Sequence, residues 1–171
     1  MNILALDPAN HTGWAHSNGT YGVWNIAHPL DSHKGQRLER LEQHLEAAIA
    51  EMGCDTLAAE DASFGSPNPA VQAMHNELRG VIHLVGFRHS IPVRLFAPST
   101  IKAFACGSGR AKKPQMIAAL KRLLGIETID EDIADAIWIL ELAKRPDCWA
   151  KSSAKKAKLP RRASKKSTRL F

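Results

Sequence analysis

Apolar residues recur along this chain with two different periods, which predict strands in some segments and helices in others. Residues 2–7 are almost wholly apolar, and the proline at position 8, which cannot donate to a sheet, marks the end of a buried strand. Residues 12–18 and 20–27 are rich in aromatic and β-branched side chains, with the turn pair Asn18-Gly19 between them. These segments predict three antiparallel strands.

The apolar period then changes to that of a helix, about 3.6 residues, over residues 34–52. Beyond it, the pattern predicts a strand over 56–59 that ends at Glu60, a helix over 70–89 and a strand over 91–96. Three more helices are expected at 99–105, 114–124 and 131–144. A strand hairpin followed by alternating helices and strands predicts an α/β fold, with a mixed sheet covered by helices on both faces.

Composition narrows the class of protein. Of 171 residues, 44% are hydrophobic and 23% charged, as in an ordinary globular domain, and no apolar run reaches the roughly 18 to 20 residues of a membrane span. Cysteines 54, 106 and 148 are too widely spaced for a disulfide framework or a zinc knuckle. With no recognisable signal peptide, we expect a cytoplasmic protein, without a membrane partner or a small-molecule cofactor.

The net charge of +6 is concentrated at the carboxyl end. Residues 151–171 hold nine of the 23 Lys and Arg and no acid, whereas the other residues hold 14 basic against 17 acidic side chains. We therefore expect a folded domain over 1–146 and a basic tail over 147–171, disordered on its own. The tail is interpreted either as an arm that binds nucleic-acid phosphates or as a solubilising terminus. The residues expected to contact DNA in the first case are Lys155, Lys156, Arg161 and Arg162.

Candidate chemistry comes from four acids. Asp7 and Glu60 end two predicted strands, and strand ends border the crevice where ligands bind in open α/β sheets. Asp132 and Asp135, three residues apart, share one face at the start of the last predicted helix. Taken singly, each has a structural explanation as a turn former or a helix-dipole partner. If all four converge to about 4 Å, they repel strongly enough to require cations, and oxygen ligands favour Mg²⁺ or Mn²⁺.

Several motifs in the chain are similar to those of RuvC Holliday-junction resolvases, nucleases of the RNase H-like superfamily. Residues 7–15 (DPANHTGWA) resemble the family's opening DPGxxxxGxA, 56–60 (TLAAE) resemble its central strand with a catalytic glutamate, and 132–136 (DIADA) resemble its DxADA signature. LRGV at 78–81 and IPV at 91–93 also resemble the family's passage from helix to strand. The resemblance runs in order over about residues 1–144 and is greatest to phage-type and prophage-type members.

The resemblance implies a homodimeric endonuclease with an RNase H-like five-stranded sheet, three strands antiparallel and two parallel, that cuts four-way DNA junctions. Asp7, Glu60, Asp132 and Asp135 would be catalytic and would bind two Mg²⁺ ions, with Mn²⁺ as a substitute. It also implies that Lys102 and Lys113 contact DNA phosphates, with Arg110 and Lys112 beside them, although a solvated basic loop explains the same residues. Three neighbouring acids, Asp61, Asp130 and Glu131, are alternative ligands, the last two also being interpreted as helix-cap residues.

Phe64 follows Glu60 by four residues, where these resolvases carry an aromatic wedge that stacks in the junction, often one residue nearer the glutamate. Other functions remain open at this point. They are an RNase H acting on RNA–DNA hybrids, a flap or branched-DNA nuclease, and a binding protein that has lost catalysis. The actin-like ATPase fold is excluded because the chain is too short for two subdomains and lacks a second phosphate loop.

Overall fold

The computed structural model describes residues 1–61, 68–128 and 130–146, and in these its elements follow the predicted order. The strands are β1 (Ile3–Asp7), β2 (His11–His16), β3 (Tyr21–Asn25), β4 (Thr56–Glu60) and β5 (Val93–Phe96). The helices are α1 (Gly35–Met52), α2 (Pro69–Arg88), α3 (Pro98–Cys106), α4 (Lys113–Leu124) and α5 (Glu131–Ala143).

The strands form one mixed sheet in the order β3-β2-β1-β4-β5. β1 pairs antiparallel with β2, and β2 with β3, across a turn in which Gly19 has a φ of 95°. β1 pairs parallel with β4, and β4 with β5. The prediction of three antiparallel strands followed by two parallel ones is therefore confirmed.

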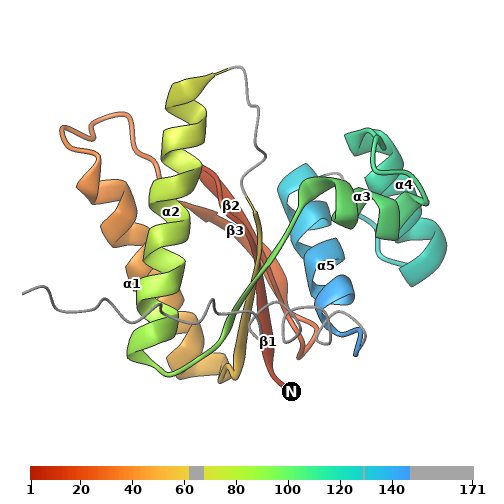
Figure 1. The fold of residues 1–171 in the computed structure, drawn as a ribbon, viewed down its shortest axis with the longest axis horizontal. Coiled ribbons are helices and arrows are strands. Elements are labelled where there is room, and N and C mark those ends of the chain that lie inside the picture. Colours follow the sequence, from red (N-terminus) through yellow and green to blue (C-terminus); the bar gives the residue numbers. More distant parts are fainter. Residues whose placement is uncertain (62–67, 129, 147–171) are drawn as a thin grey trace, which may run out of the picture.

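Helices cover both faces of this sheet, as the sequence predicted (Figure 1). Successive residues of β1 alternate between the two faces, because side chains of a strand point alternately to either side. Leu4 and Leu6 pack in the core beneath α1 and α2, whereas Ile3 and Ala5 pack in the core beneath α5. Each fully buried leucine or isoleucine contributes about 1.5–3 kcal/mol through the removal of its apolar surface from water.

An apolar stripe on α2 is part of this core. Leu78, Ile82 and Val85 are fully buried, and Met74 and Val81 pack partly buried against them. A second set of large apolar side chains on α2 is exposed, including Leu84 at 45% and Phe87 at 82%. Within the described ranges, we find no helix that is both long and apolar enough to cross a membrane.

α5 lies against the sheet and is the helix that positions the candidate acids of the last segment. Residues 136–140 are all buried, and the indole Nε1 of Trp138 donates a hydrogen bond to the carbonyl of Met116 on α4 at 3.1 Å. Its first turn is capped by Asp130, whose carboxylate accepts hydrogen bonds from the backbone N–H groups of Asp132 and Ile133. A buried and capped helix holds its amino-terminal residues in one place relative to the sheet.

Candidate active site

The two strand-end acids lie side by side at one edge of the sheet. β1 and β4 run parallel with Leu6 opposite Ala59, so the next residues along the two strands, Asp7 and Glu60, leave the sheet at the same edge. The sequence prediction that these two carboxylates border one crevice follows the general geometry of parallel strands. Both residues are largely buried at this end of the sheet, with a small part of each accessible to solvent.

α5 brings the third segment to the same edge through an unusually close backbone approach. Gly13 of β2 stands opposite Asp7 in the antiparallel register. A Cβ atom built on Gly13 would lie 2.0 Å from the carbonyl oxygen of Asp132, a separation that no side chain can occupy. Because residue 13 has no side chain, the first turn of α5 can lie directly against β2 at the position that pairs with Asp7. A glycine inside a strand commonly permits such a close backbone approach.

The charges of the four acids act on one another. Burial, followed by repulsion from Glu60, Asp135 and Asp132, raises the pKa of Asp7 well above its ordinary value. Burial and the charge of Asp135 raise the pKa of Glu60 to about 7. The pKa values of Asp132 and Asp135 are also raised, again mainly by burial. Carboxyl groups that hold their protons this tightly are characteristic of functional sites and favour a bound cation.

The predicted convergence to a ready metal centre is not observed. Among residues 1–61, 68–128 and 130–146, no three His, Cys, Asp or Glu side chains are arranged to hold one metal ion together. The four acids interact across the site electrostatically, but their oxygen atoms do not surround a common point. The donor set has the chemistry of a hard divalent cation site.

Two lysines lie near the acids, the pair that the family resemblance implies as phosphate contacts. The ammonium group of Lys113, at the start of α4, lies 2.9 Å from the carboxylate of Glu131. This hydrogen bond, with the nearby charges of Asp135 and Asp132, raises the pKa of Lys113. The positive charge of Lys102 on α3 offsets part of the upward shift in the pKa values of Glu60 and Asp135. Both lysines thus lie beside the acid cluster.

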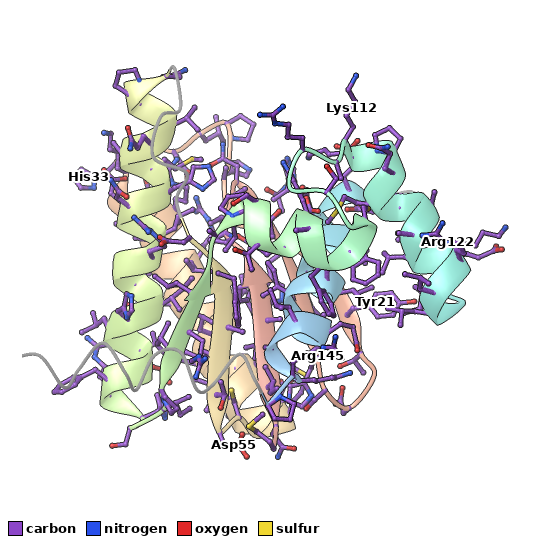
Figure 2. All side chains as sticks on the ribbon, turned by 45° about the vertical axis from the view of Figure 1, so that its right-hand side comes forward. Tyr21, His33, Asp55, Lys112, Arg122 and Arg145 are labelled. Carbon is purple, nitrogen blue, oxygen red and sulfur yellow. The ribbon has the colours of Figure 1, made fainter. Side chains whose placement is uncertain are left out.

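The other predicted DNA contacts are less closely tied to the acids. Arg110 and Lys112 are exposed in the loop between α3 and α4, and Lys112 projects from the edge of the molecule opposite to Asp55 (Figure 2). Phe64 and the tail residues Lys155, Lys156, Arg161 and Arg162 lie outside the described residues.

The three alternative ligands each have another partner. Asp130 caps α5, which confirms its interpretation as a cap residue. Glu131 pairs with Lys113, and Asp61 forms an ion pair with Arg79 of α2. These contacts favour the set of Asp7, Glu60, Asp132 and Asp135 as the group open to a ligand.

Several residues around the site have a role that the sequence motifs do not predict. Gly13 is part of the first motif, and the signal that could have revealed its role is that a glycine inside a strand is itself a sign of close backbone approach. Arg79 pairs with Asp61, the residue after Glu60, and no sequence pattern signals this pair. His11, which begins β2, lies close enough to Asp132 for its charge to lower the pKa of that acid in part.

Known proteins resemble this chain in both sequence and fold. The family model "Crossover junction endodeoxyribonuclease RuvC" matches residues 10–141. The RuvC crossover junction endodeoxyribonuclease of Paramagnetospirillum magneticum is 34% identical over 145 residues, covering 80% of this chain and 87% of the relative. That of Streptomyces avermitilis is 35% identical over 147 residues, covering 80% and 83%.

Solved structures extend the likeness to the fold. Thermus thermophilus RuvC in complex with a Holliday junction substrate superposes with a TM-score of 0.73 at 19% identity, covering 90% of this chain and 96% of that one. The yeast mitochondrial Holliday junction resolvase Ydc2 gives a TM-score of 0.57 at 12% identity, covering 87% and 83%. The chain therefore belongs to the RuvC family of crossover junction endodeoxyribonucleases, hydrolytic nucleases with an RNase H-like fold.

Proposed function

We propose that this protein is a structure-selective endonuclease that resolves four-way DNA junctions by metal-dependent hydrolysis of phosphodiester bonds. One observation carries the proposal. Asp7 is next to Glu60 through the parallel pairing of β1 and β4, and it is opposite Gly13, over which the backbone of Asp132 lies. Three segments distant in the sequence thereby supply the acids of one site.

The cation site consists of Asp7, Glu60, Asp132 and Asp135, and its natural occupants are two Mg²⁺ ions, with Mn²⁺ as a substitute. When bound, the ions supply a nucleophilic water and stabilise the charge on the leaving oxygen of the scissile phosphate. The four acids must be deprotonated to bind the cations. Because the pKa values of the acids are raised, cation binding would be coupled to the release of protons.

The lysines hold the substrate at this site. Lys102 and Lys113 lie on the α3 and α4 side of the acids, where their positive charges attract the phosphates that flank the scissile bond. Lys113 is paired with Glu131 in the free protein, and the ammonium group retains two further protons for a phosphate oxygen. Arg110 and Lys112, both exposed nearby, extend the basic surface. Phe64 is proposed to stack on a base at the centre of the junction.

A homodimer matches the symmetry of the substrate, since each active site cuts one strand and a junction offers two equivalent strands. The exposed face of α2 is the proposed dimer surface. Gly80, Leu84 and Phe87 follow one another at helical spacing on it, and all three are exposed.

Residues 1–146 form the nuclease domain in this proposal, and residues 147–171 form an arm that binds DNA phosphates. Action on DNA, together with relatives in bacteria, supports a location in the cytoplasm of a bacterial or phage-infected cell.

Cleavage of a panel of substrates tests the proposed function. Four-way junction, flap, RNA–DNA hybrid and linear duplex are incubated with the full chain in Mg²⁺ and in chelator. We expect symmetric cuts in the junction in Mg²⁺ alone. Cutting of the hybrid with no action on the junction would identify an RNase H, and cutting of the flap in preference to the junction a flap nuclease. A gel shift of the junction without cleavage would identify a binding protein.

Two variants link the activity to the site. Asp7→Asn removes one predicted ligand and is expected to abolish cleavage while junction binding persists. Asp55→Asn is the matched control, because Asp55 is exposed at the opposite end of the molecule, just before β4 (Figure 2). Cleavage by Asp7→Asn at the wild-type rate would show that the catalytic assignment is wrong.

A further inference from the structure

A hollow along α4 belongs to none of the features described so far. It lies between α4 and the segment that leads into α5, and its cavity volume is about 500 Å³. Ile117, Ala118 and Lys121 of α4 line it on one side, and Glu127 and Thr128 on the other. A volume of this size accommodates a nucleobase with its sugar, and ligand sites in proteins commonly span about 300–1,000 Å³.

α4 connects the hollow to the acid cluster. Lys113, Ile117 and Lys121 are four residues apart, so they lie on one face of the helix. The first of them contacts Glu131 and faces Asp132 and Asp135, whereas the other two line the hollow. Ile117 and Lys121 are one and two helical turns from Lys113. If a DNA strand has one phosphate at the acids and Lys113, its next nucleotide therefore lies near Ile117 and Lys121.

The opposite wall is also tied to the acids. The hydroxyl oxygen of Thr128 accepts a hydrogen bond from the backbone N–H of Asp130 at 3.0 Å, and Asp130 in turn caps the helix turn that carries Asp132. This wall therefore keeps a fixed position relative to the first turn of α5. A base bound against it is placed by the same segment that places a catalytic acid.

The lining has the composition of a base-binding site. Ile117 and Ala118 offer apolar surface to the face of a base, and the edges of the hollow carry donors and acceptors. The ammonium group of Lys121 is 2.6 Å from the carboxylate of Glu127, so both polar groups of this pair are held at the rim. The hydroxyl of Thr128 keeps its own proton to donate.

We propose that this hollow is a subsite for the nucleotide next to the scissile phosphate, where it contributes to the choice of cleavage sequence. The proposal rests on the proposed function, since it requires a DNA strand at the acids. The base turns out of the stack into the hollow, its face on Ile117 and Ala118 and its edge toward Lys121, Glu127 and Thr128. Turning a base into a protein pocket is a common means of reading it, and it is easiest at branched or unpaired positions.

The test fills the hollow with a large side chain. Ala118→Trp places an indole in the space, and because Ala118 is exposed, the change is compatible with folding. Ala50→Trp, at an exposed position of α1 on the other side of the sheet, is the matched control. A set of four-way junctions is prepared in which the nucleotides on each side of the cut are varied one at a time. Single-turnover cleavage rates are measured on each junction with saturating enzyme.

For the wild type and Ala50→Trp, we expect cleavage rates to differ by about 10-fold between the best and the worst nucleotide at one flanking position. Ala118→Trp is expected to reduce this ratio toward one at that position alone, and Lys121→Gln to lower it in part. Junction affinity, measured by gel shift in chelator, is expected to remain within about 2-fold in all four proteins, because phosphate contacts dominate affinity.

An unchanged ratio in Ala118→Trp, or equal losses in Ala118→Trp and Ala50→Trp, would overturn the subsite. Wild-type cleavage without any preference at the flanking positions would overturn it as well, while leaving the proposed function intact. Absence of any junction cleavage by the wild type would instead contradict the proposed function.

Discussion

At the scale of single residues, the site depends on a glycine as much as on its acids. Gly13→Ala would bring a Cβ atom to 2.0 Å from the carbonyl oxygen of Asp132, so the first turn of α5 must move away from the sheet. We expect a loss of about 1–3 kcal/mol in the free energy of unfolding. Junction cleavage is expected to fall by more than 10-fold, roughly the effect of displacing a catalytic group by 1 Å.

Gly22→Ala is the control that separates the effect of Gly13→Ala on the geometry of the site from its effect on the stability of the protein. Its Cβ would lie 3.1 Å from the ring of Trp14, on the neighbouring strand but away from the acids. Unfolding in urea and cleavage by the folded protein are measured on both variants. A Gly13→Ala protein that cleaves as well as Gly22→Ala would contradict the proposed role of the close approach.

Glu60 makes stability dependent on pH in the metal-free protein. Its pKa is about 7 in the folded chain and 4.5 in its ordinary state, so the folded protein holds this proton more tightly than the unfolded chain does. Stability therefore falls as the pH rises from about 4.5 to about 7, and the full loss persists at higher pH. Glu60→Gln removes this effect and is expected to be more stable than the wild type by up to about 3 kcal/mol at about pH 8.

Urea unfolding in chelator, repeated across this pH range, measures the difference between the two proteins. Asp55→Asn serves again as the control and is expected to track the wild type. A constant difference between Glu60→Gln and the wild type at all pH values would show that Glu60 does not titrate as described. The variant is expected to be inactive in cleavage, because Glu60 is a proposed cation ligand. A gain in stability with a loss of activity is common when a charged group of a functional site is removed.

At the level of secondary-structure elements, the two faces of α2 differ in exposure. Its inner face belongs to the core, and its outer face exposes Leu84 and Phe87. Phe87→Glu is expected to convert the proposed dimer into a monomer, because a charge in the centre of an apolar interface is costly to bury. Sedimentation equilibrium measures the mass. Leu123→Glu, an equally drastic change at an exposed leucine of α4, is the control and is expected to leave a dimer. A dimer of unchanged affinity in Phe87→Glu would place the interface elsewhere.

The elements themselves could be predicted from the sequence because each has a strong local signal. The aromatic and β-branched content of β2 and β3, the Asn18-Gly19 turn and the apolar period of α1 are properties of neighbouring residues, and all agree with the structure. The strand-end position of Asp7 and Glu60 also follows from local pattern. Their pairing with Asp132 does not, since it depends on how closely α5 approaches β2 at Gly13. The ion pairs Arg79–Asp61 and Lys113–Glu131 join separate elements and leave no mark in the sequence.

At the scale of the whole molecule, charge is divided between an acidic site and a basic carboxyl end. Removal of residues 151–171 eliminates nine of the 23 basic side chains. We expect weaker junction binding and a shallower salt dependence, by up to about 0.9 in the slope of log affinity against log salt for each phosphate that the tail no longer neutralises. Fluorescence anisotropy over a range of salt concentrations measures the slope. An unchanged slope would favour the alternative interpretation of the tail as a solubilising terminus.

Counting bound Mn²⁺ by calorimetry tests most directly whether acids from three distant segments share divalent cations. The wild-type chain is expected to bind two ions, whereas Asp7→Asn, Glu60→Gln and Asp132→Asn each lose at least one, and Asp55→Asn binds both. If the variants at positions 7, 60 and 132 bind Mn²⁺ as the wild type does, the acids do not form one metal site.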